Sequence, residues 1–285
     1  MQAQLLNGKE VAAHIIEQAK ADVAKLRLES IHPKLAIILV GEDPASLSYI
    51  RQKNRSCEAA EVLWEQYSYP STVDQDTIIA KIDELNADPL THGILVQLPL
   101  PGHLNVPALL KQIEPNKDVD GFHAYNLGKM FLSKDFESLV PCTPKGVIKL
   151  LEYYNLPIQG QNVTVVGHSN IVGKPMSLML LNRDATVTTC HIHTKDLKFH
   201  TLTADILVVA VGKPNLITAD MVKEGAVVID VGCNQTADGL CGDVDFKEIS
   251  NKASYITPVP GGVGPMTVAC LIENVIIAAK RQANL

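Results

Sequence analysis

The sequence predicts an α/β protein with two domains, each built around a parallel β-sheet. The chain has 285 residues, and a typical domain has roughly 150. Short, continuously apolar segments, typical of strands buried on both faces of a parallel sheet, alternate with segments of helical periodicity. The stretch 114–144 is rich in polar and turn residues, and it separates the two series of segments.

In the first series, apolar residues recur every four positions from Gly8 to about Leu28, which predicts an amphipathic helix. LAIILVG follows as a buried strand. The same reasoning predicts helices at 45–62, 74–87 and 104–113, and strands at 62–69 and 93–101. Pro115 ends the last of these helices, because proline cannot continue a helix. We expect 114–144 to be mostly irregular.

The second series begins with a helix at 143–155. The pattern then predicts strands at 162–167, 185–190, 205–211, 226–232 and 255–257, and helices at 175–181 and 266–283. Strands joined by helices imply right-handed parallel βαβ units. We therefore expect a first domain at 1–140, joined by the C-terminal helix at 266–285, and a second domain at 141–265.

Composition and charge exclude several classes of function. The net charge of −6 and the scattered basic residues give no reason to bind nucleic acid. The N-terminus has neither a signal-peptide nor a transit pattern, and the longest apolar segments are short enough to be strands, which predicts a cytoplasmic protein without membrane association. Six cysteines form no CxxC pair, so we expect reduced thiols and no zinc site.

A glycine-containing turn joins the strand at 162–167 to a helix. Gly167, Ser169 and Gly173 stand where a Rossmann-like domain brings backbone N–H groups to a dinucleotide pyrophosphate. The spacing differs from G-x-G-x-x-G, since Ser replaces the second Gly and the last Gly comes one residue late. A strand–turn–helix without a ligand remains an alternative at this point.

The end of the next strand bears on the choice of cofactor. NAD sites commonly carry an acidic residue here, whereas Cys190–Lys195 contains none before Asp196. This favours NADP, with NAD possible, because no arginine is present. The available cations are His168, His193, Lys174 and Lys195. His191, His193 and His200, with Cys190 beside them, could be taken for a metal site. Strand alternation places Cys190 and Ile192 on the opposite face from His191 and His193, so we expect no metal site.

Polar residues in the first domain form a second candidate site. Tyr49 and Lys53 are four residues apart and share a helix face, which is either a solvated face or a functional pair. The short-chain dehydrogenases have a similar Tyr-x-x-x-Lys pair, but their glycine turn precedes it. Gln97 follows an apolar strand and is either a satisfied structural amide or a site residue.

Two loops complete the candidate set. Asp118 and Asp120 precede Gly121, where aspartate usually forms a turn, although a carboxylate also accepts two hydrogen bonds from a planar donor edge. The loop at 257–267 concentrates glycine and proline beyond the needs of a simple turn, which predicts close approach of backbone to a ligand.

Together these segments resemble the bifunctional methylenetetrahydrofolate dehydrogenase/methenyltetrahydrofolate cyclohydrolase (FolD) family over nearly the whole chain. The matching segments are Pro44-Ala45-Ser46…Tyr49-x-x-x-Lys53, Val96-Gln97-Leu98-Pro99, Lys117-Asp118-Val119-Asp120-Gly121-Phe122, Pro141-Cys142-Thr143-Pro144, Gly167-x-Ser169-x-x-Val172-Gly173 and Thr257–Thr267. The resemblance implies a folate cleft between the two domains, a homodimer, NADP as cofactor and no metal.

The resemblance also implies the reactions. NADP+ takes hydride from 5,10-methylenetetrahydrofolate, and water converts the methenyl product to 10-formyltetrahydrofolate. Lys53 is implied as the key group of hydrolysis, Gln97 as its partner, Tyr49 as stacking on the folate, and Asp120 as binding the pterin edge. The implied folate-binding loop comprises Pro258, Gly261, Gly262 and Val263, and the implied nucleotide contacts are Gly167, His168, Ser169, Gly173, Ile192 and Cys233.

Four positions depart from the family pattern. His168 and Ile192 stand where cationic or hydroxyl groups often contact the 2′-phosphate, Arg55 replaces a lysine, and Glu61 replaces a usual glycine. Two other functions remain as alternatives: a shikimate- or amino-acid-type dehydrogenase, and a folate- or nucleotide-binding protein without catalysis.

Overall fold

The computed structural model describes residues 2–237 and 239–285, and contacts divide them into two compact units. The first unit comprises Ala13–Cys142 and Val268–Leu285. The second unit comprises Thr143–Thr267 and the N-terminal residues up to Ala12. Two long helices, α1 (Gly8–Leu28) and α10 (Val263–Gln282), contribute residues to both units.

The first unit contains a three-stranded parallel sheet in the order β3-β2-β4. Its strands are β2 (Lys34–Val40), β3 (Leu63–Tyr69) and β4 (Gly93–Val96). Besides parts of α1 and α10, its helices are α2 (Pro44–Ala59), α3 (Gln75–Ala87), α4 (Val106–Gln112), α5 (Ala124–Met130) and the 3-10 helix η1 (Lys134–Phe136).

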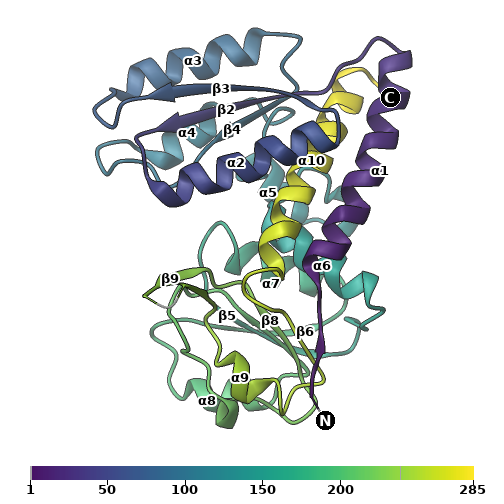
Figure 1. The fold of residues 1–285 in the computed structure, drawn as a ribbon, viewed down its shortest axis with the longest axis vertical. Helices are drawn as coiled ribbons and strands as arrows, with labels where there is room; N and C mark the ends of the chain where they lie inside the picture. The colour runs from purple at the N-terminus through teal and green to yellow at the C-terminus, as the bar shows by residue number, and fades with distance from the viewer. Residues whose placement is uncertain (1, 238) are drawn as a thin grey trace. The chain divides into compact units, whose positions relative to one another are not determined.

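Strand β2 is apolar throughout because both of its faces are covered. Leu35, Ile37 and Leu39 belong to a core shared with α1, α2 and α10. The alternate residues, such as Ile38, belong to a separate core with α3 and α4. Side chains along a strand point alternately to opposite faces, so each core receives every second residue. Figure 1 shows α3 and α2 on opposite faces of this sheet.

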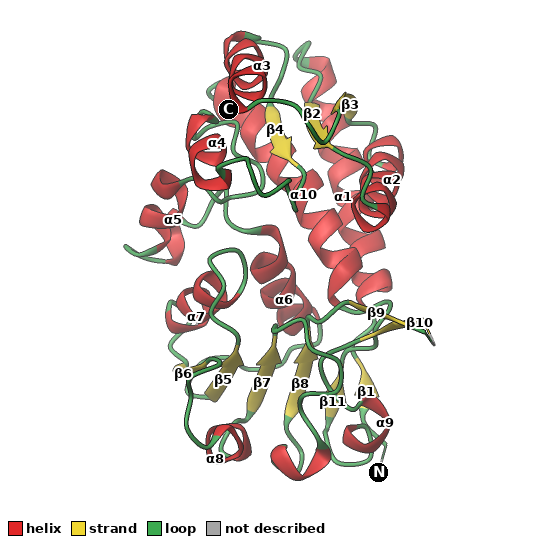
Figure 2. Ribbon diagram, turned by 90° about the vertical axis from the view of Figure 1, so that its left-hand side faces the viewer, coloured by secondary structure: helices red, strands yellow, loops and turns green. Residues whose placement is uncertain are grey.

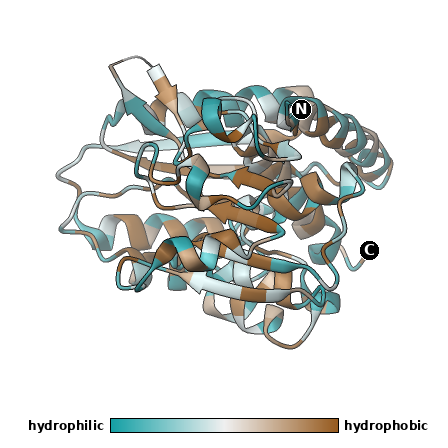
Figure 3. Cartoon of the chain, turned by 90° about the horizontal axis from the view of Figure 1, so that it is seen from below, coloured by the Kyte–Doolittle hydropathy of each residue, from teal (hydrophilic) through white to brown (hydrophobic). Residues whose placement is uncertain are grey.

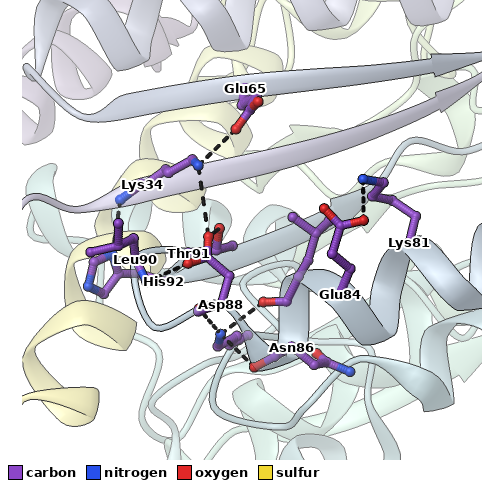
Figure 4. Close-up of polar contacts among 11 residues, drawn as sticks. Lys34, Glu65, Lys81, Glu84, Asn86, Asp88, Leu90, Thr91 and His92 are labelled. Carbon is purple, nitrogen blue, oxygen red and sulfur yellow. Dashed lines mark hydrogen bonds and ion pairs between the residues drawn. The ribbon is translucent and has the colours of Figure 1, made fainter.

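A buried lysine caps the C-terminus of α3 in the same unit. Lys117 Nζ donates hydrogen bonds of 2.9, 2.8 and 2.7 Å to the carbonyl oxygens of Leu85, Asn86 and Asp88. These carbonyls lack partners within the helix, and a cation there also interacts favourably with the helix dipole. Figure 4 shows the neighbouring ion pairs, in which Lys34 contacts Glu65 and the Asp88 side chain.

The second unit contains a six-stranded parallel sheet in the order β1-β11-β8-β7-β5-β6, whose strands Figure 2 shows side by side. Its strands are β1 (Gln4–Leu5), β5 (Asn162–Val166), β6 (Thr186–Cys190), β7 (Ile206–Val209), β8 (Val227–Asp230) and β11 (Tyr255–Ile256). The remaining elements are α6 (Cys142–Tyr153), α7 (Gly173–Leu181), α8 (Leu197–Leu202), η2 (Ala219–Met221), α9 (Phe246–Ile249) and an antiparallel hairpin of β9 (Asn234–Thr236) and β10 (Gly239–Cys241).

In each sheet, the order in which the chain adds strands reverses at an inner strand. In the second unit, β5 lies between β6 and β7, so the chain continues first to one side and then to the other. In the first unit, β2 lies between β3 and β4 in the same way. Open α/β sheets bind ligands at the carboxyl ends of strands at such switch points. The fold therefore indicates one candidate site in each unit.

The predicted fold of two α/β domains with parallel sheets is confirmed, with local corrections. The segment 114–144 is less irregular than predicted, because it contains α5 and η1. The predicted strand at 93–101 ends at Val96, which places Gln97 in the following loop. The short elements β1, β9, β10, α8 and α9 were not predicted, since two to six residues show no clear hydrophobic periodicity.

Helix α10 is both long and apolar. It is the one helix of the described residues that is long and apolar enough to cross a membrane, so the expectation that every apolar segment is too short does not hold for it. However, 67% of its apolar window is buried within the protein, as in the core helix of a globular protein. Figure 3 shows hydrophobic residues concentrated along the strands and mixed with polar ones along the helices.

Candidate active site

Helix α2 places a lysine inside the first unit. Asp43 caps the helix by accepting a 2.8 Å hydrogen bond from the Ser46 N–H. Lys53, three turns later by periodicity, is only 8% exposed, whereas Arg51 and Arg55 are exposed. The alternative of a solvated face is therefore wrong for Lys53.

The buried lysine has a neutral partner. Lys53 Nζ donates a 2.8 Å hydrogen bond to Gln97 Oε1, and Gln97 Nε2 donates to the Leu98 carbonyl at 2.6 Å. Burial lowers the pKa of Lys53, although the negative charge of Asp120 acts in the opposite direction. An amide accepts a hydrogen bond without adding charge, so Lys53 has access to its neutral form.

The two aspartates of the KDVDGF segment have different roles. Asp118 accepts hydrogen bonds from the N–H groups of Gly121, Phe122 and His123 at 3.1, 3.2 and 2.9 Å, and from Asn126 Nδ2 at 2.8 Å. Asp118 is thus the turn former that the sequence allowed. Because Asp118 is engaged in these hydrogen bonds, Asp120 is the carboxylate of this loop that is the candidate for binding a ligand.

Asp120 is half-buried and interacts electrostatically with Lys53. Burial raises the pKa of Asp120 to about 6, and the nearby Asp118 adds to the increase, while Lys53 opposes it. Gly121, next in sequence, has a φ of +75°, and a Cβ there would lie 2.3 Å from the Val140 carbonyl carbon. The backbone path beside Asp120 therefore requires glycine.

Asn274, which sequence reasoning missed, holds this loop from α10. Its fully buried Nδ2 donates to the carbonyl oxygens of Val119 and Val140 at 2.8 and 3.0 Å, and it lies 3.5 Å from Cys142 Sγ. Cys142 Sγ also donates to the Val119 carbonyl at 3.4 Å. Its signal in the sequence was a polar residue within the apolar run of α10, a signal that it shares with its neighbour Glu273.

Tyr49 lies one helical turn before Lys53 on α2 and is half-buried. Residues four apart lie on the same face of a helix. The structure thus brings Lys53 together with Gln97 and Asp120, and it places Tyr49 on the same helix face.

The glycine turn of the second unit is tightly packed. Gly167 has a φ of +125°, and a Cβ there would lie 2.2 Å from the Ala210 carbonyl oxygen. A Cβ at Gly173 would lie 2.1 Å from the Gly167 carbonyl oxygen. Ser169 Oγ accepts from the N–H groups of Val172 and Gly173 at 3.2 and 3.4 Å, so the serine that replaces the second glycine supports the start of α7.

Imidazoles gather beside this turn. The ring centroids of His168 and His191 are 4.9 Å apart, and those of His191 and His193 are 6.0 Å apart. Ile192 is 88% exposed and Cys233 is also exposed. Among the described residues, no group of three or more His, Cys, Asp or Glu could hold a metal ion.

A second aspartate pair, also missed from the sequence, orders the loops next to the turn. Asp243 accepts from the N–H groups of Val211, Gly212 and Lys213 at 2.7, 3.0 and 2.9 Å. Asp230 in turn accepts from the Asp243 N–H at 2.9 Å. These contacts join residues 13 to 32 positions apart, which the sequence pattern does not reveal.

The glycine–proline loop is packed against the start of α1. A Cβ at Gly8 would lie 1.7 Å from the Gly262 carbonyl oxygen, and the Lys9 N–H donates to the Gly261 carbonyl at 3.2 Å. Gly261 has a φ of +112°. Pro258 and Val263 lie at the two ends of this turn, and Val263 begins α10. Close approach of backbone to backbone accounts for these glycines.

Comparison with known proteins now identifies the family. Residues 6–120 match the family model of the catalytic domain of tetrahydrofolate dehydrogenase/cyclohydrolase, and residues 141–283 match the model of its NAD(P)-binding domain. The chain belongs to the tetrahydrofolate dehydrogenase/cyclohydrolase family. The resemblance inferred from the sequence is therefore confirmed.

Individual relatives cover the chain from end to end. The bifunctional protein FolD of Dechloromonas aromatica is 54% identical and covers 100% of both chains. The crystal structure of the bifunctional enzyme FolD from Campylobacter jejuni is 48% identical, with a TM-score of 0.95 over 98% of this chain and 99% of that one. The Trypanosoma brucei FolD, solved with NADP cofactor and an inhibitor, is 35% identical with a TM-score of 0.95 and covers 100% of both chains.

A more distant likeness concerns the fold alone. Shikimate 5-dehydrogenase from Thermus thermophilus is 12% identical with a TM-score of 0.54, and the match covers 87% of this chain and 99% of that one. A shikimate-type function is consequently not favoured.

Proposed function

We propose that this protein oxidises 5,10-methylenetetrahydrofolate with NADP+ and hydrolyses the resulting 5,10-methenyltetrahydrofolate to 10-formyltetrahydrofolate. Membership of the family supports both reactions. The observation that carries the proposal is the buried Lys53–Gln97 pair beside Asp120. It supplies a lysine with a lowered pKa next to a carboxylate, which a catalytically silent binding protein would not need.

The second unit fits a dinucleotide at the Gly167 turn. A Cβ at Gly167 or Gly173 would collide with backbone, so both positions require glycine, as in the tight strand–turn–helix that brings backbone N–H groups to a pyrophosphate. NADP+, when bound, accepts the hydride that leaves the methylene carbon. We propose Gly167, His168, Ser169, Gly173, Ile192 and Cys233 as residues that line it.

A neutral Lys53 suits the product of the first step. Loss of hydride leaves the folate carbon as a methenyl cation, and an ammonium group beside it would be repelled. Burial favours the uncharged amine, and the Gln97 amide adds no negative charge that would hold the proton, so the lysine is compatible with the cation.

The same amine then serves hydrolysis. Water forms a bond to the methenyl carbon while Lys53 Nζ takes one of its protons. The bond between that carbon and N5 breaks as N5 receives the proton from Lys53, and the remaining hydroxyl proton leaves to solvent as the formyl C=O forms. One water is consumed and one proton is released, and the formyl group stays on N10.

The other residues bind and orient the folate. Asp120 accepts hydrogen bonds from the N–H groups of the aminopyrimidine edge, which requires its ionised form. Tyr49 stacks on the folate from the helix face that carries Lys53. We further propose that Pro258, Gly261, Gly262 and Val263 shape the folate-binding loop.

Three further assignments belong to the proposal. The catalytic domain comprises 1–140 together with the helix at 266–285. The NADP-binding domain comprises 141–265, and strand β1 from the first residues of the chain joins the sheet of this second domain. The protein works as a homodimer. It is a soluble protein of the cytoplasm, with no partner among nucleic acids or membranes.

A paired assay with Lys53→Ala tests the function. Purified protein receives methylenetetrahydrofolate with NADP+ or NAD+, and formation and decay of the methenyl product are followed by absorbance. The wild type should show both activities, and Lys53→Ala should lose the cyclohydrolase activity. Arg55→Ala, which removes an exposed cation from the same helix, is the matched control and should retain both. Full cyclohydrolase activity in Lys53→Ala would refute the role of this lysine, and absence of oxidation with either cofactor in the wild type would refute the dehydrogenase function.

A further inference from the structure

We propose that Asp243 is a positioning residue for the nucleotide: its carboxylate fixes the loop after β7, residues 210–217, against the Gly167 turn. The inference rests on the proposed function, because the ligand it concerns is the NADP+ of the proposed dehydrogenase. Asp243 does not touch the nucleotide in this proposal. It acts through the backbone of the loop that it holds.

The loop after β7 lies where the fold places a ligand. Strands β5 and β7 are parallel neighbours, with Val166 opposite Val209. The strand order reverses at β5, and ligands of open α/β sheets bind at the carboxyl ends of strands at such a point. A Cβ at Gly167 would lie 2.2 Å from the Ala210 carbonyl oxygen, so the glycine turn rests directly on the first residue of this loop. Movement of the loop after β7 would therefore disturb the Gly167 turn.

The hydrogen bonds of Asp243 use its full acceptor capacity. Its Oδ2 accepts from the N–H groups of Val211 and Gly212 at 2.7 and 3.0 Å. Its Oδ1 accepts from the Lys213 N–H at 2.9 Å and from Asn234 Nδ2 at 2.8 Å. An ionised carboxylate has about four acceptor sites. Because four donors of the protein occupy them and the residue is fully buried, this carboxylate serves the loop and not a ligand.

The loop needs an anion at this point. Three consecutive backbone N–H groups that converge on one point form an anion-binding concavity, and Gly212 permits the convergence with its φ of +66°. A carboxylate offers acceptors from both of its oxygens. An asparagine at position 243 would keep one acceptor oxygen and would turn an NH2 group toward other N–H donors. Replacing the carboxylate by an amide should therefore release part of the loop.

Asp243 is itself fixed to the sheet. Asp230, the last residue of β8, accepts from the Asp243 N–H at 2.9 Å and from the Val244 N–H at 3.1 Å. The far end of the loop is tied to the same segment, since the Ile217 N–H donates to the Asp243 carbonyl at 3.1 Å and the Asp245 N–H donates to the Ile217 carbonyl at 2.9 Å. The end of β8 thus determines where Asp243 stands, and Asp243 determines where the loop after β7 stands.

The first measurement is the affinity for NADP+, by calorimetric titration into the full chain. Asp243→Asn should weaken binding about 10- to 100-fold, the range expected for hydrogen bonds to a charged group. Asp245→Asn is the matched control. It makes the same change of charge at a partly exposed residue that caps α9 by accepting from the Glu248 N–H at 3.2 Å, and asparagine also caps helices. It should leave the affinity unchanged.

Hydrolysis of methenyltetrahydrofolate without nucleotide separates positioning from loss of the fold. The residues proposed for hydrolysis, Lys53 and Gln97, belong to the first unit, so Asp243→Asn should keep this rate. In the oxidation, the KM for NADP+ should rise by the same factor as the dissociation constant, whereas kcat should change less. A rise in KM without a matching fall in kcat is the pattern of lost binding.

A milder variant tests the same carboxylate from another segment. Asn234→Ala removes one donor to Asp243 and leaves the three backbone donors, so NADP+ binding should weaken about 3- to 10-fold. Combined with Asp243→Asn, it should bring no further loss, because the amide acts through the carboxylate. If Asp243→Asn does not fold, Asn234→Ala alone decides, and an unchanged affinity overturns the proposal.

Contrary outcomes are distinct. Unchanged NADP+ affinity in a folded Asp243→Asn variant, or an equal loss in Asp245→Asn, would overturn the proposal and leave the proposed dehydrogenase standing. So would additive losses in the double variant, because the amide and the carboxylate would then act independently of the bond between them. A wild type that binds no NADP+ and oxidises no folate would overturn the proposed function itself, and this inference with it.

Discussion

Lys53 and Gln97 are 44 residues apart, and their side chains meet in a 2.8 Å hydrogen bond. Lys53 lies on the helix that follows β2, and Gln97 directly follows β4. The two strands are parallel neighbours, and the Gln97 N–H also donates to the Ile38 carbonyl at 2.9 Å. The carboxyl end of β4 therefore supplies Gln97, and the helix that follows the adjacent strand supplies Lys53. Because the acceptor is an uncharged amide, the buried amine is oriented without being fixed as a cation.

The first prediction changes the charge of this acceptor. Gln97→Glu places a carboxylate where the amide oxygen stands, and an opposite charge at this distance raises a lysine pKa by about 1–3 units. The free amine should become about 10- to 1000-fold scarcer at neutral pH. Cyclohydrolase activity should fall accordingly, and its pH optimum should move upward. Steady-state rates across pH measure both effects.

A charge control accompanies that variant. Gln66→Glu adds the same charge on β3, where Gln66 Nε2 bonds to Ser68 at an exposed position. It should leave the pH profile unchanged. If Gln97→Glu kept both its rate and its pH optimum, the amide would have no role in the protonation of Lys53.

The second prediction concerns Asp120, whose raised pKa of about 6 gives activity and stability opposite pH dependences. Folate binding needs the ionised carboxylate, so kcat/KM should fall as the pH drops through about 6. Folding favours the protonated form, so this group's contribution to stability is fully present below its ordinary pKa of 3.8 and is lost as the pH rises through 6.

Asp120→Asn separates the two effects. The variant should lose most folate-dependent activity and the acid limb near pH 6. At about pH 7.5 it should be more stable to urea than the wild type, by about 1–3 kcal/mol, with the difference disappearing toward pH 4. A variant that keeps the acid limb would assign that limb to another group.

The sequence was sufficient for those parts of the fold and site that depend on local periodicity. The four-residue spacing placed Tyr49 and Lys53 on one helix face, and the apolar strands of both sheets were recognisable from continuous hydrophobic runs. The polar residue after β4 was recognisable for the same reason, since Gln97 interrupts an apolar segment.

The remaining features depend on contacts between distant residues. Asp118 and Asp120 are indistinguishable in sequence, and only the N–H groups that surround Asp118 make it the structural one. Asn274 contacts Val119 from 155 positions away, and Asp243 holds a loop about 30 positions earlier. One sequence contains no signal for such pairings, because they arise from tertiary packing.

The third prediction concerns Asn274. Asn274→Leu removes the donor for the carbonyl oxygens of Val119 and Val140 in a fully buried position. The Val119 carbonyl then keeps only the weak Cys142 thiol donor, and the Val140 carbonyl loses its Asn274 donor. Each buried group left without a partner costs about 1–3 kcal/mol, so urea denaturation should show a loss of about 1–4 kcal/mol. Asn251→Ala, an exposed asparagine with one bond to a helix carbonyl, is the control and should change stability by less than about 1 kcal/mol. A small effect of Asn274→Leu would show that the loop carrying Asp120 is held by other contacts.

The fourth prediction concerns Gly242, which lies against the buried Asp230. A Cβ at Gly242 would stand 1.8 Å from Asp230 Oδ2, so Gly242→Ala must displace a carboxylate that accepts from the N–H groups of Asp243 and Val244. We expect a loss of about 3 kcal/mol or more in urea, together with weaker NADP+ binding, because Asp243 holds the loop that follows β7. Gly128→Ala offers the contrast, since its Cβ would meet no atom within 4 Å in α5 and helix propensity favours alanine by about 0.5–1 kcal/mol. Equal stability of the two variants would mean that the Asp230 carboxylate moves aside without cost.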